Sequence, residues 1–178
     1  MNKKLKIAVV GATGAVGEAM LSILAEYGFG DADVHALASE KSLGKSVDFG
    51  HRSLPVEVLD DYDFSGTDYG LFSAGAGISL KHAPRAAKAG CTVIDNTSAF
   101  RLDDDMPLVV PEINGDLLES LKAGSIIANP NCSTIQMLIA IAPVHALAGI
   151  ERINVATYQS VSGAGSEGLD ELARQTMD

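Results

Sequence analysis

Cys132 combines a reactive side chain with a suggestive position. It lies in the run Asn-Pro-Asn-Cys-Ser-Thr-Ile-Gln at positions 129–136, which leads into a long apolar stretch that we expect to be helical. Pro130 suits a helix start and Asn131 can cap it, so Cys132 should lie in the first turn. The positive end of a helix dipole stabilises a thiolate, the nucleophilic form of cysteine. The alternative, a thiol buried as a small apolar side chain, explains Cys91 better.

A glycine-rich loop is the second chemical signal. Between an apolar run and an amphipathic pattern, the chain reads Gly-Ala-Thr-Gly-Ala-Val-Gly at positions 11–17. Glycines in a strand-to-helix turn let the backbone approach a pyrophosphate, whose charge the helix N-terminus favours. The loop therefore predicts a dinucleotide site, and a glycine-rich turn without a ligand is the alternative.

The residues after the second expected strand indicate which dinucleotide would bind. An NAD site usually has an acidic residue at this strand end, about 20 residues after the loop, to hold the ribose hydroxyls. Here Ser39 is followed by Glu40, Lys41, Ser42 and, a little later, Lys45. Hydroxyls and lysines suit a 2′-phosphate, so we expect NADP, with Glu40 pointing away from the cofactor. An ordinary solvated loop is the alternative.

Apolar runs alternate with helical patterns along most of the chain. We expect strands at 5–10, 34–38, 56–59, 69–73, 92–95 and 125–128, and helices at 15–27, 80–89, 116–122 and 133–147. Strands and helices in alternation predict an α/β domain with a Rossmann-type, doubly wound, mostly parallel sheet.

This alternation ends near residue 130. Residues 153–161 alternate apolar and polar side chains, as strands of antiparallel sheets do, and another helix is expected over 167–177. We therefore expect a cofactor-binding domain over residues 1–130. Residues 131–178 would begin a second, α+β domain for catalysis and dimerisation, with too few elements to close a core alone.

Composition excludes several classes of protein. Of 178 residues, 47% are hydrophobic, enough for a core, and the net charge of −10 disfavours a nucleic-acid or anionic-membrane surface. The apolar stretch 135–150 is interrupted by polar residues and too short to span a bilayer, so no membrane span is expected. Lysines near the N-terminus imitate a signal peptide, but the glycines and Glu18 that follow argue against one. Two cysteines fit a reducing cytoplasm.

Several segments together resemble the bacterial aspartate-semialdehyde dehydrogenases. They are the glycine loop, Asn-Thr-Ser-Ala-Phe-Arg at 96–101, Val-Pro-Glu-Ile-Asn at 110–114, the cysteine run, and Gln-Ser-Val-Ser-Gly-Ala-Gly at 159–165. The resemblance implies a homodimer or tetramer that interconverts aspartate 4-semialdehyde, phosphate and NADP with aspartyl 4-phosphate and NADPH. That step feeds lysine, threonine, methionine and diaminopimelate synthesis.

The same resemblance implies roles for individual residues. Cys132 corresponds to the nucleophile that carries the acyl thioester, Gln159 to a glutamine that contacts the substrate, and Arg101 to an arginine that binds phosphate. The positions that correspond to cofactor contacts are Gly11, Thr13, Gly14, Ala15, Val16, Lys41, Ser42, Ser162 and Gly163. The aspartates at 103–105 are better explained as a solvated turn than as a metal site, so no metal is expected.

Thioester chemistry also needs a base, usually a histidine. His145 follows Cys132 on the same expected helix, roughly 20 Å away at about 1.5 Å per residue. His35, His51 and His82 are expected in a strand, a loop and a helix start, and none is well placed. In the family, the catalytic histidine and a substrate-binding arginine come from later sequence, so we expect this chain to be an N-terminal portion that is inactive alone. A noncatalytic NADP-binding module and a reductase of another acyl phosphate remain alternatives.

Overall fold

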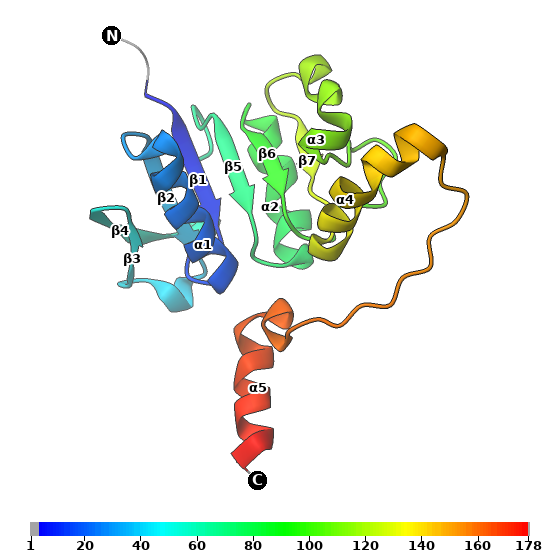
Figure 1. Cartoon of the computed structure of the whole chain (residues 1–178). Coiled ribbons are helices and arrows are strands. Elements are labelled where there is room, and N and C mark those ends of the chain that lie inside the picture. Colours follow the sequence, from blue (N-terminus) through cyan, green and yellow to red (C-terminus); the bar gives the residue numbers. More distant parts are fainter. Residues whose placement is uncertain (1–3, 178) are drawn as a thin grey trace. The chain divides into compact units, whose positions relative to one another are not determined.

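A computed structural model describes residues 4–177, and the chain divides into two compact units between Asn131 and Cys132. The described part of the first unit holds a seven-stranded sheet in the order β3-β4-β2-β1-β5-β6-β7 (Figure 1). Its strands are β1 (Lys6–Val10), β2 (Asp33–Ala38), β3 (Ser46–Phe49), β4 (Arg52–Val58), β5 (Tyr69–Phe72), β6 (Thr92–Asp95) and β7 (Ile126–Ala128). Its helices are α1 (Ala15–Leu24), α2 (Ala76–Lys88) and α3 (Pro111–Asn114).

Neighbouring strands run parallel throughout this sheet except at the β3–β4 pair. The central strand β1 pairs with β2 and β5, so that Val10 lies opposite both Leu37 and Phe72. Its continuous apolar run is typical of a strand covered on both faces. The predicted Rossmann-type, doubly wound, mostly parallel sheet is confirmed. Since parallel strands share a direction, the loops after β1, β2, β5, β6 and β7 leave from one edge.

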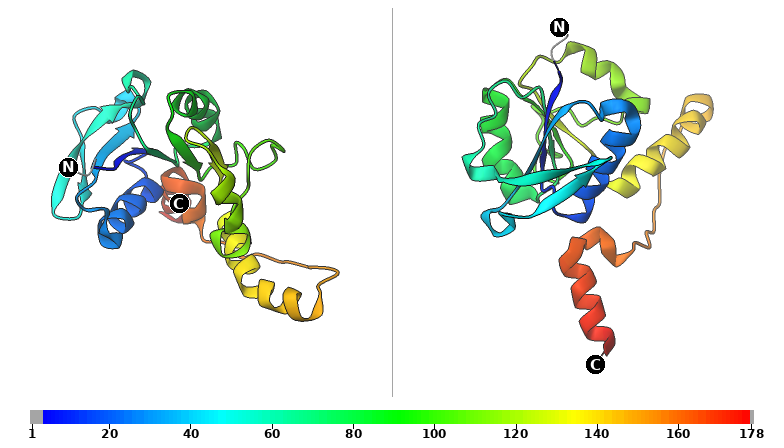
Figure 2. Two further views of the ribbon diagram at one scale, coloured as in Figure 1. Left: turned by 90° about the horizontal axis from the view of Figure 1, so that it is seen from above. Right: turned by 90° about the vertical axis from the view of Figure 1, so that its left-hand side faces the viewer.

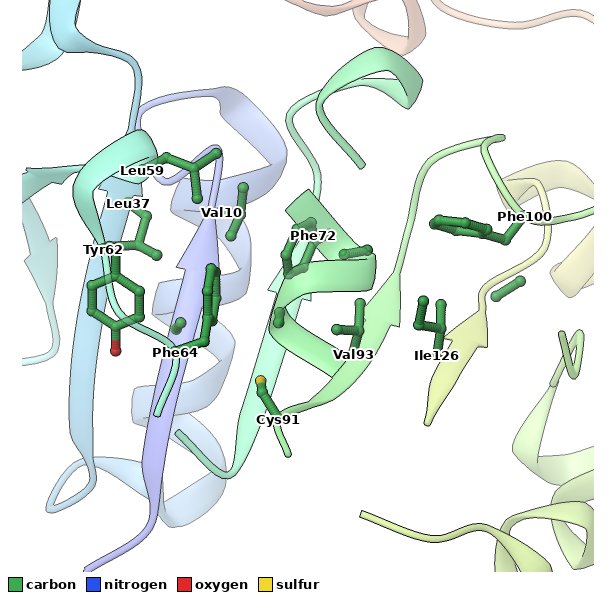
Figure 3. Packing of buried hydrophobic residues seen from close by; sticks show 14 residues of the cluster. Val10, Leu37, Leu59, Tyr62, Phe64, Phe72, Cys91, Val93, Phe100 and Ile126 are labelled. Atoms are coloured by element: carbon green, nitrogen blue, oxygen red, sulfur yellow. The ribbon is translucent and has the colours of Figure 1, made fainter. Parts of the chain in front are cut away.

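Two apolar cores lie on opposite faces of the sheet, because successive side chains of a strand point to opposite sides. Ala8 and Val10 belong to one core, which includes Ala83 and Ala86 of α2. The alternate residues of β1 belong to the other core, together with Leu21 of α1. Helices α1 and α2 accordingly cover opposite faces (Figure 2), and Figure 3 shows the aromatic side chains that fill the first core.

The β3–β4 hairpin is longer than the sequence patterns indicated. We expected a single strand at 56–59, whereas β4 begins at Arg52 and pairs with β3 in antiparallel register. Pro55, which argues against a strand interior, lies opposite Ser46 where the ladder ends. Gly50 makes the turn possible, since its φ of 60° is a left-handed conformation.

Two helix predictions need correction. Helix α2 begins at Ala76 instead of residue 80. The short helix expected at 116–122 is a 3₁₀ helix at Gly115–Ser120, which follows α3 at Pro111–Asn114. The Asn114 side chain accepts a hydrogen bond from the Val110 N–H at 2.8 Å, which starts the helix earlier in the chain.

The described part of the second unit, residues 132–177, contains two helices, α4 (Cys132–Ala148) and α5 (Gly165–Met177), with a 3₁₀ turn at Val161–Ala164 (Figure 1). The strand predicted at 153–161 is wrong, since residues 151–160 have no regular structure. Alternation of apolar and polar side chains suits a strand, but a strand also requires ladder hydrogen bonds from a neighbour. Within residues 4–177, no helix has the length and apolar character needed to cross a membrane.

Phe72 tests the packing of the first core. Its side chain is fully buried and stacks on Phe64 with ring centroids 6.1 Å apart. Phe72→Ala should lower the free energy of unfolding by about 3–5 kcal/mol, because it removes apolar contacts and leaves a cavity. Leu102 is 98% exposed, so Leu102→Ala should change it by less than about 0.5 kcal/mol. Equal effects of the two variants in urea denaturation would contradict this description of the core.

Candidate functional site

The glycine loop connects β1 to α1 through a tightly packed turn. Gly11 has a φ of 87°, and a Cβ built there would lie 3.0 Å from the Ala74 backbone nitrogen. A Cβ on Gly17 would lie 2.1 Å from the Gly11 carbonyl oxygen, so the helix and loop are closer than any side chain permits. The N–H groups of Gly11 and Ala12 donate to the Leu37 oxygen at 2.9 and 3.1 Å and attach the loop to the end of β2.

The N-terminus of α1 faces out of this loop with the properties of an anion site. Gly14 is the N-cap residue and has no side-chain cap. The first N–H groups of any helix, here those of Ala15, Val16 and Gly17, have no acceptor within the helix. Ala15 and Val16 are exposed, so their N–H groups and the helix dipole can meet a phosphate there.

The loop after β2 contacts the glycine loop directly. A 3₁₀ turn at Glu40–Ser42 buries Ser42, whose Oγ lies 3.4 Å from the Thr13 Oγ1. Lys41 and Glu40 are exposed beside it. The structure thus brings together two predicted cofactor-binding segments that are 29 residues apart.

Arg101 is held at the same edge of the sheet by two backbone carbonyl groups. Its Nε donates to the Asn129 oxygen at 2.9 Å and its Nη2 to the Asn96 oxygen at 3.1 Å. Asn96 follows β6 and Asn129 follows β7, and the Asn129 amide also donates to the Asn96 Oδ1 at 2.6 Å. These contacts use two of the five N–H groups of a guanidinium, a group suited to oxyanions. The following aspartates form an exposed turn in which the Asp103 side chain accepts the Asp105 N–H.

Cys132 is the first residue of α4 and its side chain is exposed, which matches its predicted position at a helix start. Gln136, one turn later, donates to the Cys132 carbonyl oxygen at 3.3 Å. Cys91 differs from Cys132 in both exposure and position, because it is fully buried and lies just before the amino end of β6. Burial raises the pKa of the Cys91 thiol to about 12, and the charge of Asp68 adds to this effect.

The Gln159–Gly163 segment forms a compact turn within the second unit. The Gly163 N–H donates to the Ser160 oxygen at 3.0 Å, and the Ser162 hydroxyl donates to the Ser160 Oγ at 3.0 Å. A Cβ on Gly163 would lie 1.8 Å from the Gln159 Nε2, so the glycine leaves room for the glutamine amide. Gln159, Ser162 and Gly163 are exposed.

His82 forms contacts within the fold and not with the predicted site residues. His82 is buried, and its Nδ1 accepts a hydrogen bond from the Arg85 Nε at 3.0 Å. Burial lowers the pKa of His82, with Arg85 and Lys81 acting in the same direction and Asp60 opposing them. These contacts favour a neutral ring within the fold.

Two other histidines are also engaged in local structure. His35 on β2 contacts Glu57 on β4 at 2.7 Å. The His145 Nδ1 accepts the Ile150 N–H at 3.0 Å, just beyond the end of α4. His51 lies in the turn between β3 and β4.

One polar group at the carboxyl edge of the sheet, the carboxylate of Asp95, was not among the residues predicted from the sequence. The buried Asp95 accepts hydrogen bonds from the Ser79 and Thr97 hydroxyls at 2.6 and 2.7 Å. The signal in the sequence is the run Asp-Asn-Thr-Ser at 95–98, at the end of an apolar strand, since ligands bind at the carboxyl ends of parallel strands.

Two family models match the chain. One, described as semialdehyde dehydrogenase, NAD binding domain, matches residues 6–121. The other, described as semialdehyde dehydrogenase, dimerisation domain, matches residues 141–178.

Similar proteins carry a consistent name. Aspartate-semialdehyde dehydrogenase 2 of Vibrio cholerae is 53% identical over 99% of this chain and 52% of its own length. Aspartate-semialdehyde dehydrogenase of Legionella pneumophila is 51% identical over 100% of this chain and 51% of its own length. The chain therefore spans about half the length of the curated relatives it matches.

Solved structures of aspartate-semialdehyde dehydrogenases have folds similar to that of this chain. The crystal structure of aspartate semialdehyde dehydrogenase II complexed with ASA from Vibrio cholerae matches with a TM-score of 0.92 and 52% identity, over 99% of this chain and 52% of that one. The structure of aspartate semialdehyde dehydrogenase with NADP from Candida albicans matches with a TM-score of 0.62 and 25% identity, over 82% and 48% of the two chains.

Gly17 and Gly77 form a matched pair that tests the close packing of the loop. Both lie in helices, but a Cβ on Gly17 would overlap backbone atoms, whereas a Cβ on Gly77 would meet nothing within 4 Å. Gly17→Ala should lower the free energy of unfolding by about 1–3 kcal/mol, as overpacking does. Gly77→Ala should leave it unchanged or raise it by up to about 1 kcal/mol. Thermal unfolding measures both, and a harmless Gly17→Ala would refute the close contact.

Alkylation should separate the two thiols. Iodoacetamide at neutral pH should modify the exposed Cys132 and spare Cys91, which is buried and has a raised pKa. Peptide mass mapping after a short exposure identifies the modified residue. In urea both should react, which serves as the control, and faster labelling of Cys91 in the folded chain would contradict the assignment.

Proposed function

This chain belongs to the semialdehyde dehydrogenases, and we propose that it contributes the cofactor platform and the nucleophile of an aspartate-semialdehyde dehydrogenase. The reaction interconverts aspartate 4-semialdehyde, phosphate and NADP with aspartyl 4-phosphate and NADPH. The observation that carries this proposal is the match of nearly the whole chain, at about half identity, to relatives with that name.

The glycine loop suits a dinucleotide. A Cβ on Gly11 would crowd the backbone of Ala74, so the loop keeps a backbone surface that a pyrophosphate can approach. Gly14, Ala15 and Val16 would hold that pyrophosphate at the start of α1, with Thr13 beside them. When bound, the nicotinamide ring accepts or returns the hydride of the reaction.

We assign NADP as the cofactor because of the loop after β2. Ser42 contacts Thr13, so this loop adjoins the expected cofactor site, and Lys41 stands exposed next to it. An ammonium group and a hydroxyl are suitable partners for a 2′-phosphate. Ser162 and Gly163 of the second unit are assigned to a contact near the nicotinamide.

Cys132 performs the covalent chemistry in this proposal. Its thiolate attacks the aldehyde carbon and forms a C–S bond, and the former carbonyl oxygen takes up a proton. The hydrogen on that carbon then leaves as a hydride, for which bound NADP would be the acceptor, and the hydroxyl proton passes to a general base, so that a thioester remains. A phosphate oxygen then attacks the thioester carbon, the C–S bond breaks, and its electron pair returns to sulfur. Gln159 would hold the substrate and Arg101 would bind the phosphate.

The wider assignments rest on the same relatives. We infer a homodimer or tetramer because the model that matches residues 141–178 is described as a dimerisation domain. The step serves lysine, threonine, methionine and diaminopimelate synthesis in the cytoplasm, where the thiols of Cys91 and Cys132 would stay reduced. Small molecules, and neither nucleic acid nor a membrane, are the partners.

Lys41→Ala tests the choice of cofactor. It should weaken NADP binding by about 1.5–3 kcal/mol, the contribution of a hydrogen bond to a charged group, and leave NAD binding unchanged. Lys88→Ala, the same charge change on the exposed side of α2, is the control. Calorimetric titration of both cofactors measures the difference, and equal or tighter binding of NAD by the unsubstituted chain would refute NADP.

Cys132→Ser tests the nucleophile. The substitution should abolish phosphate-dependent NADPH formation from aspartate semialdehyde and the acyl adduct detected by mass spectrometry, because a serine hydroxyl is a far weaker nucleophile near neutral pH. Cys91→Ala should keep both signals. The assay uses this chain extended to the length of its relatives, of which it spans about half, because the family resemblance implies a histidine base and a substrate-binding arginine in later sequence. Turnover that survives Cys132→Ser would assign the chemistry elsewhere, and a fully noncatalytic cofactor-binding role would be indicated if the unsubstituted extended protein gave neither signal.

A further inference from the structure

Asp95 is a buried charged residue to which the proposed function assigns no role. It is the last residue of β6 and is fully buried, as is Ser79 in α2. Its Oδ1 accepts the Ser79 hydroxyl at 2.6 Å, and its Oδ2 accepts the Thr97 hydroxyl at 2.7 Å. Distances this short are typical of hydroxyls bonded to a carboxylate. A buried carboxylate without such partners would be strongly destabilising, so these contacts are required where Asp95 lies.

One of these contacts organises the turn that leads to Arg101. Besides its hydroxyl bond, Thr97 donates its N–H to the Asp95 Oδ1 at 3.4 Å. The Thr97 Oγ1 in turn accepts the Ala99 N–H at 3.2 Å. The carboxylate therefore defines the course of residues 96–99, from the end of β6 to the turn that contains Arg101.

The two residues whose carbonyl groups hold Arg101 are both linked to the backbone of Asp95. The Asn96 oxygen, which accepts the Arg101 Nη2, belongs to the next residue in the chain. The Asn129 oxygen accepts the Arg101 Nε, and the Asn129 N–H donates to the Asp95 backbone oxygen at 2.8 Å. A change in the backbone at Asp95 would move both acceptors together.

We infer that Asp95 is a positioning residue for Arg101: through Thr97 and the carbonyls of Asn96 and Asn129, it sets the direction of the guanidinium at the carboxyl edge of the sheet. Which ligand this guanidinium then meets rests on the proposed function, where it is inorganic phosphate. Asp95 itself does not touch the ligand.

The competing explanation is that Asp95 only fastens α2 to the sheet through Ser79. The two hydroxyl contacts of Asp95 can separate these explanations. They have nearly equal lengths, but the Ser79 hydroxyl belongs to α2 and the Thr97 hydroxyl to the turn that leads to Arg101. Ser79→Ala removes the bond to α2, and Thr97→Val removes the bond to the Arg101 turn with little change in shape. Asp95→Asn alters both.

The experiment follows the Arg101 Nε–H signal in proton–nitrogen NMR spectra of the 178-residue chain. Loss of the Arg101 signal in Arg101→Lys assigns it. Asp95→Asn and Thr97→Val should shift this signal and speed its exchange with water by about tenfold, since its acceptor is no longer held in place. Ser79→Ala should leave the signal unchanged while lowering the melting temperature. Asp104→Asn, an equal charge change on the exposed neighbouring turn, should alter neither.

Titration with inorganic phosphate, followed through the same Arg101 Nε–H signal, measures how each substitution changes phosphate binding. Asp95→Asn and Thr97→Val should weaken phosphate binding by about tenfold relative to Ser79→Ala. If Asp95→Asn does not fold, Thr97→Val alone decides between the two explanations. An unchanged Arg101 signal in a folded Thr97→Val chain would overturn the positioning role, as would an equal shift in Ser79→Ala.

The two proposals can fail separately. If phosphate leaves the Arg101 signal of the unsubstituted chain unmoved, the assignment of Arg101 to phosphate fails. The positioning role of Asp95 would still be supported if Thr97→Val, and not Ser79→Ala, releases the signal.

Discussion

Parallel pairing of β1, β2, β5, β6 and β7 is the constraint on which the candidate site depends. Because these strands point the same way, every loop at their carboxyl ends emerges at one edge of the sheet. The glycine loop, the Ser42 turn, the Arg101 turn and Asn129 are distant in sequence, yet all belong to that edge. A doubly wound sheet binds its ligands there for this reason.

Close backbone packing is the second requirement, and glycine is the residue that permits it. At Gly17 the helix approaches the Gly11 carbonyl so closely that a methyl group would collide with it. The same principle operates in the second unit, where Gly163 accommodates the Gln159 amide. In both places the absence of a side chain fixes the position of a neighbouring polar group.

The second unit contains two segments, α4 and residues 151–160, whose sequence patterns are typical of elements packed against other elements. Helix α4 is apolar on all sides and exposes Ile139, Val144 and Leu147. A helix with apolar residues all round is normally buried, and the C-terminal half of α4 lies within the segment 141–178 that matches the family model described as a dimerisation domain. Residues 151–160 alternate like a strand but form no ladder with any other residue among 4–177.

The sequence by itself determined the elements whose causes are local. A continuous apolar run followed by Gly-Ala-Thr-Gly predicted β1, the loop and α1, and Pro130 with Asn131 predicted the helix that begins at Cys132. Hydrophobic periodicity and helix-start residues act within a few positions of the chain, so they can be recognised without coordinates.

Tertiary structure decided the features that need distant partners. The β3–β4 hairpin, the irregular course of 151–160 and the Thr13–Ser42 contact depend on strand pairing and loop packing. The link from Asp95 to Arg101 also runs through Asn129, which is 28 residues beyond the arginine. A buried carboxylate and an exposed one are identical in sequence, and only the fold determines which hydroxyls surround it and which guanidinium it positions.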